Sequence, residues 1–260
     1  MIKRRRDEAG RAASCVQAQA ALADLGFCCA RPVTGVSFVN DQAIHAEEWF
    51  PGGEVRLGDD PTTAGAFGAL YARAQRLLDK VQVGPPLPNP SWVRWSEPIP
   101  FPQLWWQEWW VLTAPMPQLI WDIADRVRAR LADCRLPLSL GHADWETQNI
   151  RWDGESPHVV HDWDSLAYLP EAALVGIASG TFASNEIPTL APIESSTAFM
   201  YEYQSTRGRS FSREEQEVAW AASLWPAVYN ARNQIMYDRP RAAFAALEDQ
   251  GAERLALASA

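Results

Sequence analysis

Cysteine is scarce in this sequence, and its spacing argues against two kinds of structural site. The four cysteines are Cys15, Cys28, Cys29 and Cys134. This spacing fits neither a zinc site nor a disulfide framework. We interpret the adjacent Cys28 and Cys29 as two small, half-buried residues rather than a redox pair. A reducing compartment, the cytoplasm, is therefore the expected location.

The sequence also lacks long apolar runs and an excess of basic residues. No run of about 18 apolar residues is present, so no membrane span is expected. The basic start, Met1–Arg6, is not followed by the apolar core of a signal peptide. Lys and Arg number 23 against 32 Asp and Glu, a net charge of -9, which argues against nucleic-acid binding. An acidic surface suits a cationic small molecule, although many cytosolic proteins are equally acidic.

Motifs for several other chemistries are missing as well. The sequence contains neither the Gly-x-Ser-x-Gly motif of serine hydrolases nor a Walker phosphate loop. His158 and His161 are three residues apart on an expected strand, so they point to opposite faces and are poorly placed to share zinc. The apolar share of 47% is nevertheless sufficient for a sizeable core, in one large domain or two small ones.

The chemistry that is present is concentrated in one short segment. His142 to Asn149 reads His-Ala-Asp-Trp-Glu-Thr-Gln-Asn, and an apolar run then ends in Asp162. Phosphoryl transfer requires a carboxylate to orient and deprotonate a hydroxyl, and two oxygen ligands to hold magnesium on the nucleotide phosphates. Asp144, Asn149 and Asp162 are residues of these types.

The spacing predicts that these three side chains meet. Asn149–Trp152 is typical of a short strand, His158–His161 of the returning strand, and Asp153–Pro157 of the loop between them. Paired residues lie about 5 Å apart, so Asn149 and Asp162 could share a small hard cation at the open end of this hairpin. Asp144 lies in the loop that enters it. A surface loop with an Asx turn before an ordinary hairpin is the simpler alternative, but it does not explain the convergence.

The segment from Gly141 to Asp164 resembles the catalytic core of the aminoglycoside phosphotransferase family, relatives of the protein kinases that phosphorylate small molecules. Their pattern is His-x-Asp-x-x-x-x-Asn, followed by an apolar strand that ends in Asp, and every position matches. The resemblance implies ATP, or another nucleoside triphosphate, and Mg²⁺ as cofactors, and a small-molecule hydroxyl as acceptor. It implies the following roles: Asp144 as catalytic base, Asn149 and Asp162 as magnesium ligands, His142 as a brace for the loop, and Asp164 as a supporting residue.

The first 49 residues fit part of the small lobe of the same family. A helix is expected over Arg11–Leu25 with a glycine C-cap at Gly26, and two strands over Val33–Val39 and Gln42–Glu47. The resemblance makes Glu47 to Trp49 the hinge whose backbone pairs with adenine. The expected fold is α+β, protein-kinase-like and two-lobed. Residues 1–49 form a curtailed small lobe with a β-hairpin and a helix, and residues 50–260 form a mostly helical catalytic and substrate lobe.

The N-terminus departs from the family pattern. No room remains for the first two strands or the phosphate-covering loop that joins them. Ile2–Arg4 is either the end of the strand whose lysine contacts the phosphates, which makes Lys3 that lysine, or a solvated basic start. The helix offers Gln17 and Gln19 where a Glu partner is usual. Either the reading frame begins too late or part of the nucleotide site is lost, so a kinase-like binding protein without turnover, or an inactive truncated homologue, stays open beside the enzyme.

The remainder of the chain is expected to be helical. Between residues 85 and 115 a proline-rich stretch precedes a tryptophan-rich insertion in which Trp105/Trp109 and Trp106/Trp110 are four residues apart. This insertion is either an aromatic wall for an organic or cationic substrate or a subdomain that buries its tryptophans. Helices are expected over residues 60–80, 118–134, 171–182, 193–204, 213–236 and 239–257, with a kink or break at Pro226.

Overall fold

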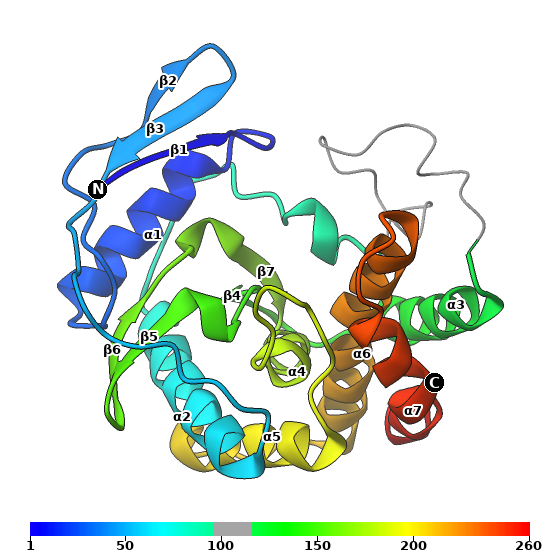
Figure 1. The fold of residues 1–260 in the computed structure, drawn as a ribbon. Coiled ribbons are helices and arrows are strands. Elements are labelled where there is room, and N and C mark those ends of the chain that lie inside the picture. The colour runs from blue at the N-terminus through cyan, green and yellow to red at the C-terminus, as the bar shows by residue number, and fades with distance from the viewer. Residues whose placement is uncertain (96–115) are drawn as a thin grey trace.

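The computed structural model describes residues 1–95 and 116–260. A small sheet with one α-helix lies at one end, two short β-ribbons occupy the middle, and the six other α-helices form the other end (Figure 1). The predicted tryptophan pairs at residues 105–110 lie outside the described residues, so the choice between an aromatic wall and a buried subdomain stays open there. Trp95, at the start of that segment, is buried and contacts Trp225 edge-on, with ring centroids 6.4 Å apart.

The N-terminal sheet shows that the basic start of the chain is a strand. Strand β1 (Ile2–Arg6) pairs with β3 (Gln42–Ala46), and β3 pairs with β2 (Ser37–Val39), all antiparallel. Because side chains alternate along a strand, Lys3 and Arg5 are half-buried while Arg4 and Arg6 are exposed. The start is therefore a paired strand, and only its Arg4 and Arg6 side chains match the alternative of a solvated basic start. β2 is shorter than expected, but Asn40 has a positive φ and forms the predicted turn.

Helix α1 (Ala12–Asp24) lies against this sheet and ends as predicted. Gly26 has φ +80°, a left-handed conformation that glycine adopts without strain, and it terminates the helix two residues after the last helical position. The predicted helix and hairpin of the small lobe are thus confirmed. The boundary between residues 49 and 50 stays a prediction.

Two ribbons carry the segment with the carboxylates. β4 (Leu138–His142) pairs with β7 (Leu166–Pro170), and β5 (Ile150–Asp153) forms a hairpin with β6 (Ser156–Val160). The predicted five-residue loop is too long, since Asp153 pairs with Ser156 and only Gly154 and Glu155 lie between them. Strand β7 was not predicted. Its residues lead directly into a helix, and their pairing with β4 is a long-range contact that no local pattern reveals.

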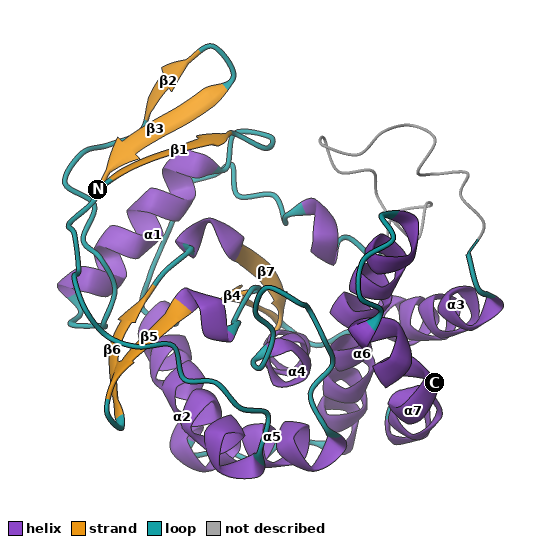
Figure 2. Ribbon diagram, viewed as in Figure 1, coloured by secondary structure: helices purple, strands orange, loops and turns teal. Residues whose placement is uncertain are grey.

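The predicted helices of the large lobe are confirmed (Figure 2). Asp60 caps α2 by accepting hydrogen bonds from the backbone of Thr62 and Thr63, and Ser212 and Glu215 form a capping box at α6. Pro226 lies inside α6 without dividing it. The helices are α2 (Pro61–Leu78), α3 (Gln118–Ala132), α4 (Glu171–Thr181), α5 (Ile193–Arg207), α6 (Arg213–Met236) and α7 (Ala242–Leu257). In the described part of the chain, none of the helices is long and apolar enough to cross a membrane.

Glycines set the distance between the helices beneath the ribbons. A Cβ atom on Gly176 of α4 would lie 2.1 Å from the carbonyl oxygen of Ala219 on α6, and one on Gly68 of α2 would lie 2.3 Å from the carbonyl oxygen of Phe199 on α5. Both partners are backbone atoms, which cannot move aside alone. The α4–α6 and α2–α5 contacts therefore require glycine, and they fix α4 at the depth from which it reaches the site described below.

Replacing Gly176 by Ala should test this packing constraint. The added methyl group forces α4 and α6 apart, and overpacking of this kind typically costs about 1–3 kcal/mol. We expect the free energy of unfolding, measured by urea denaturation, to fall by that amount. Gly35→Ala is the matched control, because its Cβ would meet no atom within 4 Å. Equal stability of both variants would contradict the proposed close approach.

Candidate active site

The loop after β4 is held by a buried histidine. His142 is fully buried, its Nδ1 lies 3.2 Å from the backbone N–H of Asp144, and its Nε2 lies 3.1 Å from the carbonyl oxygen of His161. The ring therefore accepts one hydrogen bond and donates the other, which requires the neutral form. Burial lowers the pKa of His142 to about 4, opposed by its contacts with the backbone of His161 and with Asp162. A ring that stays neutral at pH 7 supports the loop but carries no charge.

Asn149 contacts Asp144 directly. The residue ends the single 3-10 turn Thr147–Asn149 before β5, and its side-chain amide donates to Oδ2 of Asp144 at 3.0 Å and to the Asp144 carbonyl at 2.9 Å. The backbone carbonyl of Asn149 accepts a hydrogen bond from the backbone N–H of His161 at 2.8 Å, which ties Asn149 to the end of β6. The loop and the hairpin thus meet as the sequence predicted. With its nitrogen turned toward Asp144, the amide oxygen of Asn149 is left for another partner.

Asp162 lies two residues beyond Val160, the last paired residue of β6. The β5–β6 ladder ends at the pair Ile150–Val160, so Asp162 is not on a paired strand. It adopts the left-handed conformation, with φ 64° and ψ 41°, which Asp tolerates better than most residues. Burial and then the negative charge of Asp162 raise the pKa of Asp144, while the hydrogen bond from Asn149 opposes this.

Two basic residues of β1 reach the two acidic residues after β6. Lys3 Nζ lies 3.9 Å from Oδ1 of Asp162, and Arg5 forms an ion pair with Asp164. Arg5 was missed in the sequence, although its two-residue spacing from Lys3 placed it on the same face of the strand. Asp164, predicted as a supporting residue, is half-buried and has one oxygen, Oδ1, without a hydrogen-bond partner among the described residues.

The segment from Glu47 to Trp49 differs from the predicted hinge. The backbone N–H and C=O of Glu47 are both engaged with Met1, and the N–H of Glu48 donates to Arg31. Only the Glu48 carbonyl and the backbone of Trp49 have no hydrogen bond among the described residues. Glu47 instead directs its buried side chain to Lys3, with Oε1 3.4 Å from Nζ. Trp49 is 67% exposed.

The expected helix partners of Lys3 have other roles. Gln17 accepts the N–H of Gly84, and Gln19 donates to Oε2 of Glu47 at 2.9 Å. Neither amide has a hydrogen bond to the Lys3 ammonium among the described residues. The reason is local, since Glu47 lies between helix α1 and Lys3. Its carboxylate contacts Gln19 on the helix and Lys3 on β1.

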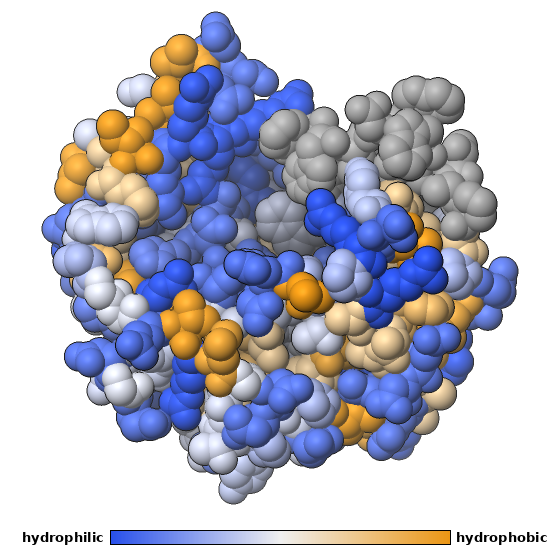
Figure 3. All heavy atoms as spheres, in the orientation of Figure 1, coloured by the Kyte–Doolittle hydropathy of each residue, from blue (hydrophilic) through white to orange (hydrophobic). Residues whose placement is uncertain are grey.

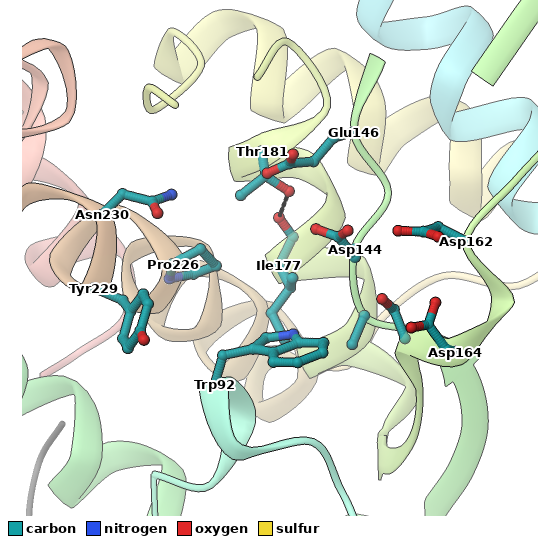
Figure 4. Close-up of a pocket in the computed structure, with 12 residues that line it drawn as sticks. Trp92, Asp144, Glu146, Asp162, Asp164, Ile177, Thr181, Pro226, Tyr229 and Asn230 are labelled. Atoms are coloured by element: carbon teal, nitrogen blue, oxygen red, sulfur yellow. Dashed lines mark hydrogen bonds between the residues drawn. The ribbon is translucent and has the colours of Figure 1, made fainter. Parts of the chain in front are cut away.

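A cavity of about 260 Å³ opens beside these residues. Figure 4 shows carboxylates along one side and residues of α4 and α6 facing them, and Figure 3 shows the hydrophilic hollow between the N-terminal sheet and the helices. Glu146 was not predicted; it is buried, its Oε2 accepts from Gln148 at 2.6 Å, and burial followed by the charge of Asp144 raises its pKa. The cavity is lined by Trp92, Ala143, Asp144, Glu146, Asp162, Asp164, Ser165, Ile177, Thr181, Pro226, Tyr229 and Asn230.

The donor atoms suit magnesium bound together with phosphate. In the described ranges, no group of three His, Cys, Asp or Glu side chains is arranged to hold a metal by itself. The amide oxygen of Asn149 and the half-exposed carboxylate of Asp162 are hard oxygen donors on neighbouring chain segments. Mg²⁺ is usually bound through one or two carboxylates plus substrate phosphates, so this small donor set fits a metal that arrives with a nucleotide.

Comparison with solved structures gives the same fold. The chain is similar to an amicoumacin kinase in complex with AMP-PNP and Ca²⁺ (TM-score 0.67, 15% identity, covering 98% of this chain and 81% of that one). It is similar to a microcompartment-associated aminopropanol kinase (0.64, 15%, 99% and 84%). A choline/ethanolamine kinase family protein from Mesorhizobium loti is comparable (0.62, 17%, 100% and 83%). The expected kinase-like α+β fold is thereby confirmed. Among curated proteins, none matches the chain.

A family model assigns the chain to a protein family, which structural similarity at such low sequence identity cannot do. The model of the phosphotransferase enzyme family matches residues 1–192. This range includes the N-terminal sheet, both ribbons and every candidate site residue that the sequence predicted. It covers well over half of the 260 residues. The chain belongs to the phosphotransferase enzyme family.

Proposed function

We propose that this protein transfers the γ-phosphoryl group of ATP to a hydroxyl group of a small, cationic molecule. One observation carries the proposal most directly: the Asp144 carboxylate lines the cavity while its other side is held by the Asn149 amide. This arrangement fixes a carboxylate beside a space that admits a small acceptor. Family membership supports kinase-type chemistry for this chain.

Asp144 is the proposed catalytic base. Its raised pKa brings the carboxylate nearer to the proton affinity that a base requires at neutral pH. It orients the acceptor hydroxyl and accepts its proton as the new oxygen–phosphorus bond forms and ADP leaves. The hydrogen bond from Asn149 and the tie from the Asp144 backbone to His142 keep the carboxylate in one position. Positioning and electrostatic stabilisation provide most of the rate gain in reactions of this class.

The nucleotide is proposed to lie between the N-terminal sheet and the hairpin. Lys3 points from β1 toward Asp162, and it would contact the phosphates there. The oxygen atoms of Asn149 and Asp162 would hold Mg²⁺, which neutralises phosphate charge when bound. The Glu48 carbonyl and the backbone of Trp49 are the groups left to contact the base.

The acceptor cavity favours a cation. Four carboxylates line it, from Asp144, Glu146, Asp162 and Asp164. The cations of β1 lie beside only two of them, Lys3 beside Asp162 and Arg5 beside Asp164. Trp92 and Tyr229 add aromatic faces to the same cavity, and such faces attract ammonium groups. An amino alcohol or amino sugar combines the required hydroxyl with a charge of the right sign. The similar solved structures include kinases named for aminopropanol and choline/ethanolamine.

The binding protein without turnover is not favoured. One of its motivations was the lack of a carboxylate partner for Lys3 on the helix, and Glu47 provides that carboxylate from elsewhere. Asn149 contacts Asp144, and Asp162 lies near enough for its charge to raise the pKa of Asp144.

Replacement of Asp144 by Asn should abolish turnover and spare nucleotide binding. Loss of a general base typically costs about 10²–10⁴-fold in rate, so kcat for phosphorylation of an accepted amino alcohol should fall by that factor. The affinity for MgATP, measured by calorimetry, should change little. Asp153→Asn, in the exposed hairpin turn, is the matched control. An unchanged kcat in Asp144→Asn would refute the assigned role.

Replacement of Asp162 by Asn should remove the magnesium dependence of ATP binding. The variant keeps the size of the side chain but loses the negative charge that attracts the cation. Calorimetric titrations with ATP in the presence and absence of Mg²⁺ should differ strongly in the wild type and only weakly in the variant. A variant that retains the full difference would show that Asp162 is not a magnesium ligand.

Replacement of Glu146 by Gln should weaken selection of cationic acceptors. A thermal-shift panel of amino sugars and hydroxylated amines, with their neutral alcohol analogues as reference, measures this selection. The wild type should be stabilised by the amines alone, and Glu146→Gln should lose most of that stabilisation. Glu155→Gln, at the exposed tip of the hairpin, should behave like the wild type. Stabilisation of the wild type by the neutral analogues instead would contradict the proposed charge.

A further inference from the structure

We propose that Glu47 is the positioning residue that holds Lys3 for the nucleotide phosphates. The two residues form an ion-paired clamp, and its anionic half comes from the sheet and not from a helix. In protein kinases the corresponding strand lysine pairs with a glutamate of the adjacent helix. The inference rests on the proposed nucleotide site. It assigns Glu47 a role through its side chain, which differs from the hinge role predicted from the sequence.

The ion pair is formed by adjacent strands. Lys3 lies on β1, and Glu47 follows the last residue of its antiparallel partner β3, with Oε1 3.4 Å from Nζ. The Glu47 side chain is 0% exposed and that of Lys3 is 16% exposed. The ammonium is therefore held at its inner side and open at its outer side. That open side faces Asp162, whose Oδ1 is 3.9 Å away.

Helix α1 contributes a neutral amide where a carboxylate would be expected. The nitrogen of the Gln19 side chain donates to Oε2 of Glu47 at 2.9 Å and to the carbonyl of Ala30 at 2.7 Å. Both Gln19 and Glu47 are buried. The amide is thus anchored by Ala30 and orients the carboxylate, leaving Oε1 for Lys3. A glutamate at position 19 would place two carboxylates in contact.

Burial makes this arrangement costly to disrupt. A buried carboxylate without a cation is strongly unfavourable, and Lys3 is the cation that contacts Glu47 among the described residues. The ring of His45 lies near the other oxygen of the carboxylate, 3.7 Å from Oε2. Burial acts to raise the pKa of Glu47, but contacts with His45, Gln19 and Lys3 together lower it to about 2. Glu47 is therefore ionised at neutral pH.

The consequence is a clamp whose two charged residues belong to the N-terminal sheet segment and not to helix α1. Glu47 is fixed by its backbone bonds to Met1, and Lys3 by the ladder with His45. Movement of α1 would remove the Gln19 hydrogen bond that orients the carboxylate, but both charged residues would stay on the sheet segment. Lys3 is thus held on one side by Glu47. Its ammonium group can still donate hydrogen bonds on the side of Asp162, the proposed magnesium ligand.

Calorimetry with two ligands tests the proposal. Glu47→Gln should weaken MgAMP-PNP binding roughly tenfold to a hundredfold, a loss typical of removing an interaction with a charged group. It should leave the affinity for adenosine unchanged, because adenosine has no phosphates. Asp24→Asn, which removes an exposed ion pair with Arg31 in the same region, should alter neither affinity. Equal weakening of both ligands would overturn the proposal in favour of a hinge or purely structural role.

A double-mutant cycle separates positioning from simple loss of folding. Lys3→Met should weaken MgAMP-PNP binding, and adding Glu47→Gln to it should have little further effect, because Glu47 acts through Lys3. Additive losses would overturn the proposal. If the wild type bound neither ligand, the proposed function would fail. The same cycle, measured on the free energy of unfolding in urea, would then support the ion pair if non-additive and refute it if additive.

Discussion

The buried imidazole of His142 connects the two parts of the candidate active site. One of its nitrogens holds the backbone of Asp144, and the other holds the carbonyl of His161, just before Asp162. Because the ring is fully buried and neutral, one nitrogen accepts a hydrogen bond and the other donates one, and neither can exchange its role. The loop after β4 and the end of β6 are thereby tied together. The contacts of Asn149 with Asp144 and with His161 depend on the same connection.

Charge balance explains why the N-terminal sheet belongs to the site. Four carboxylates border one cavity, and like charges in such proximity are unfavourable unless they are offset. Strand β1 offsets two of them, since alternate residues place Lys3 beside Asp162 and Arg5 against Asp164. Asp144 and Glu146 have no cation among the described contacts, and their pKa values are raised. The cavity is therefore acidic on the side remote from the sheet, where a cationic acceptor would be favoured.

The sequence predicted the parts of this structure that depend on local patterns. The helices, the β5–β6 hairpin and the meeting of Asp144 with Asn149 follow from periodicity, caps and turn residues. Features that depend on distant pairing were missed. Strand β7 forms only through its pairing with β4. The side chain of Glu47 contacts Lys3 on β1 and Gln19 on α1, and both are distant in sequence. Glu146, Trp92 and Tyr229 become cavity residues only when α4 and α6 pack beside the loop, which glycine contacts allow.

The central claim is that this acidic cavity hosts phosphoryl transfer to a hydroxyl group. Mass spectrometry of hydroxylated amines incubated with the protein, ATP and Mg²⁺ tests it most directly. The account predicts that at least one acceptor gains a phosphoryl group on oxygen, with stoichiometric release of ADP. It is contradicted if the protein binds MgATP and converts it only to ADP and inorganic phosphate, or if neutral alcohols are phosphorylated while amino alcohols and amino sugars are not.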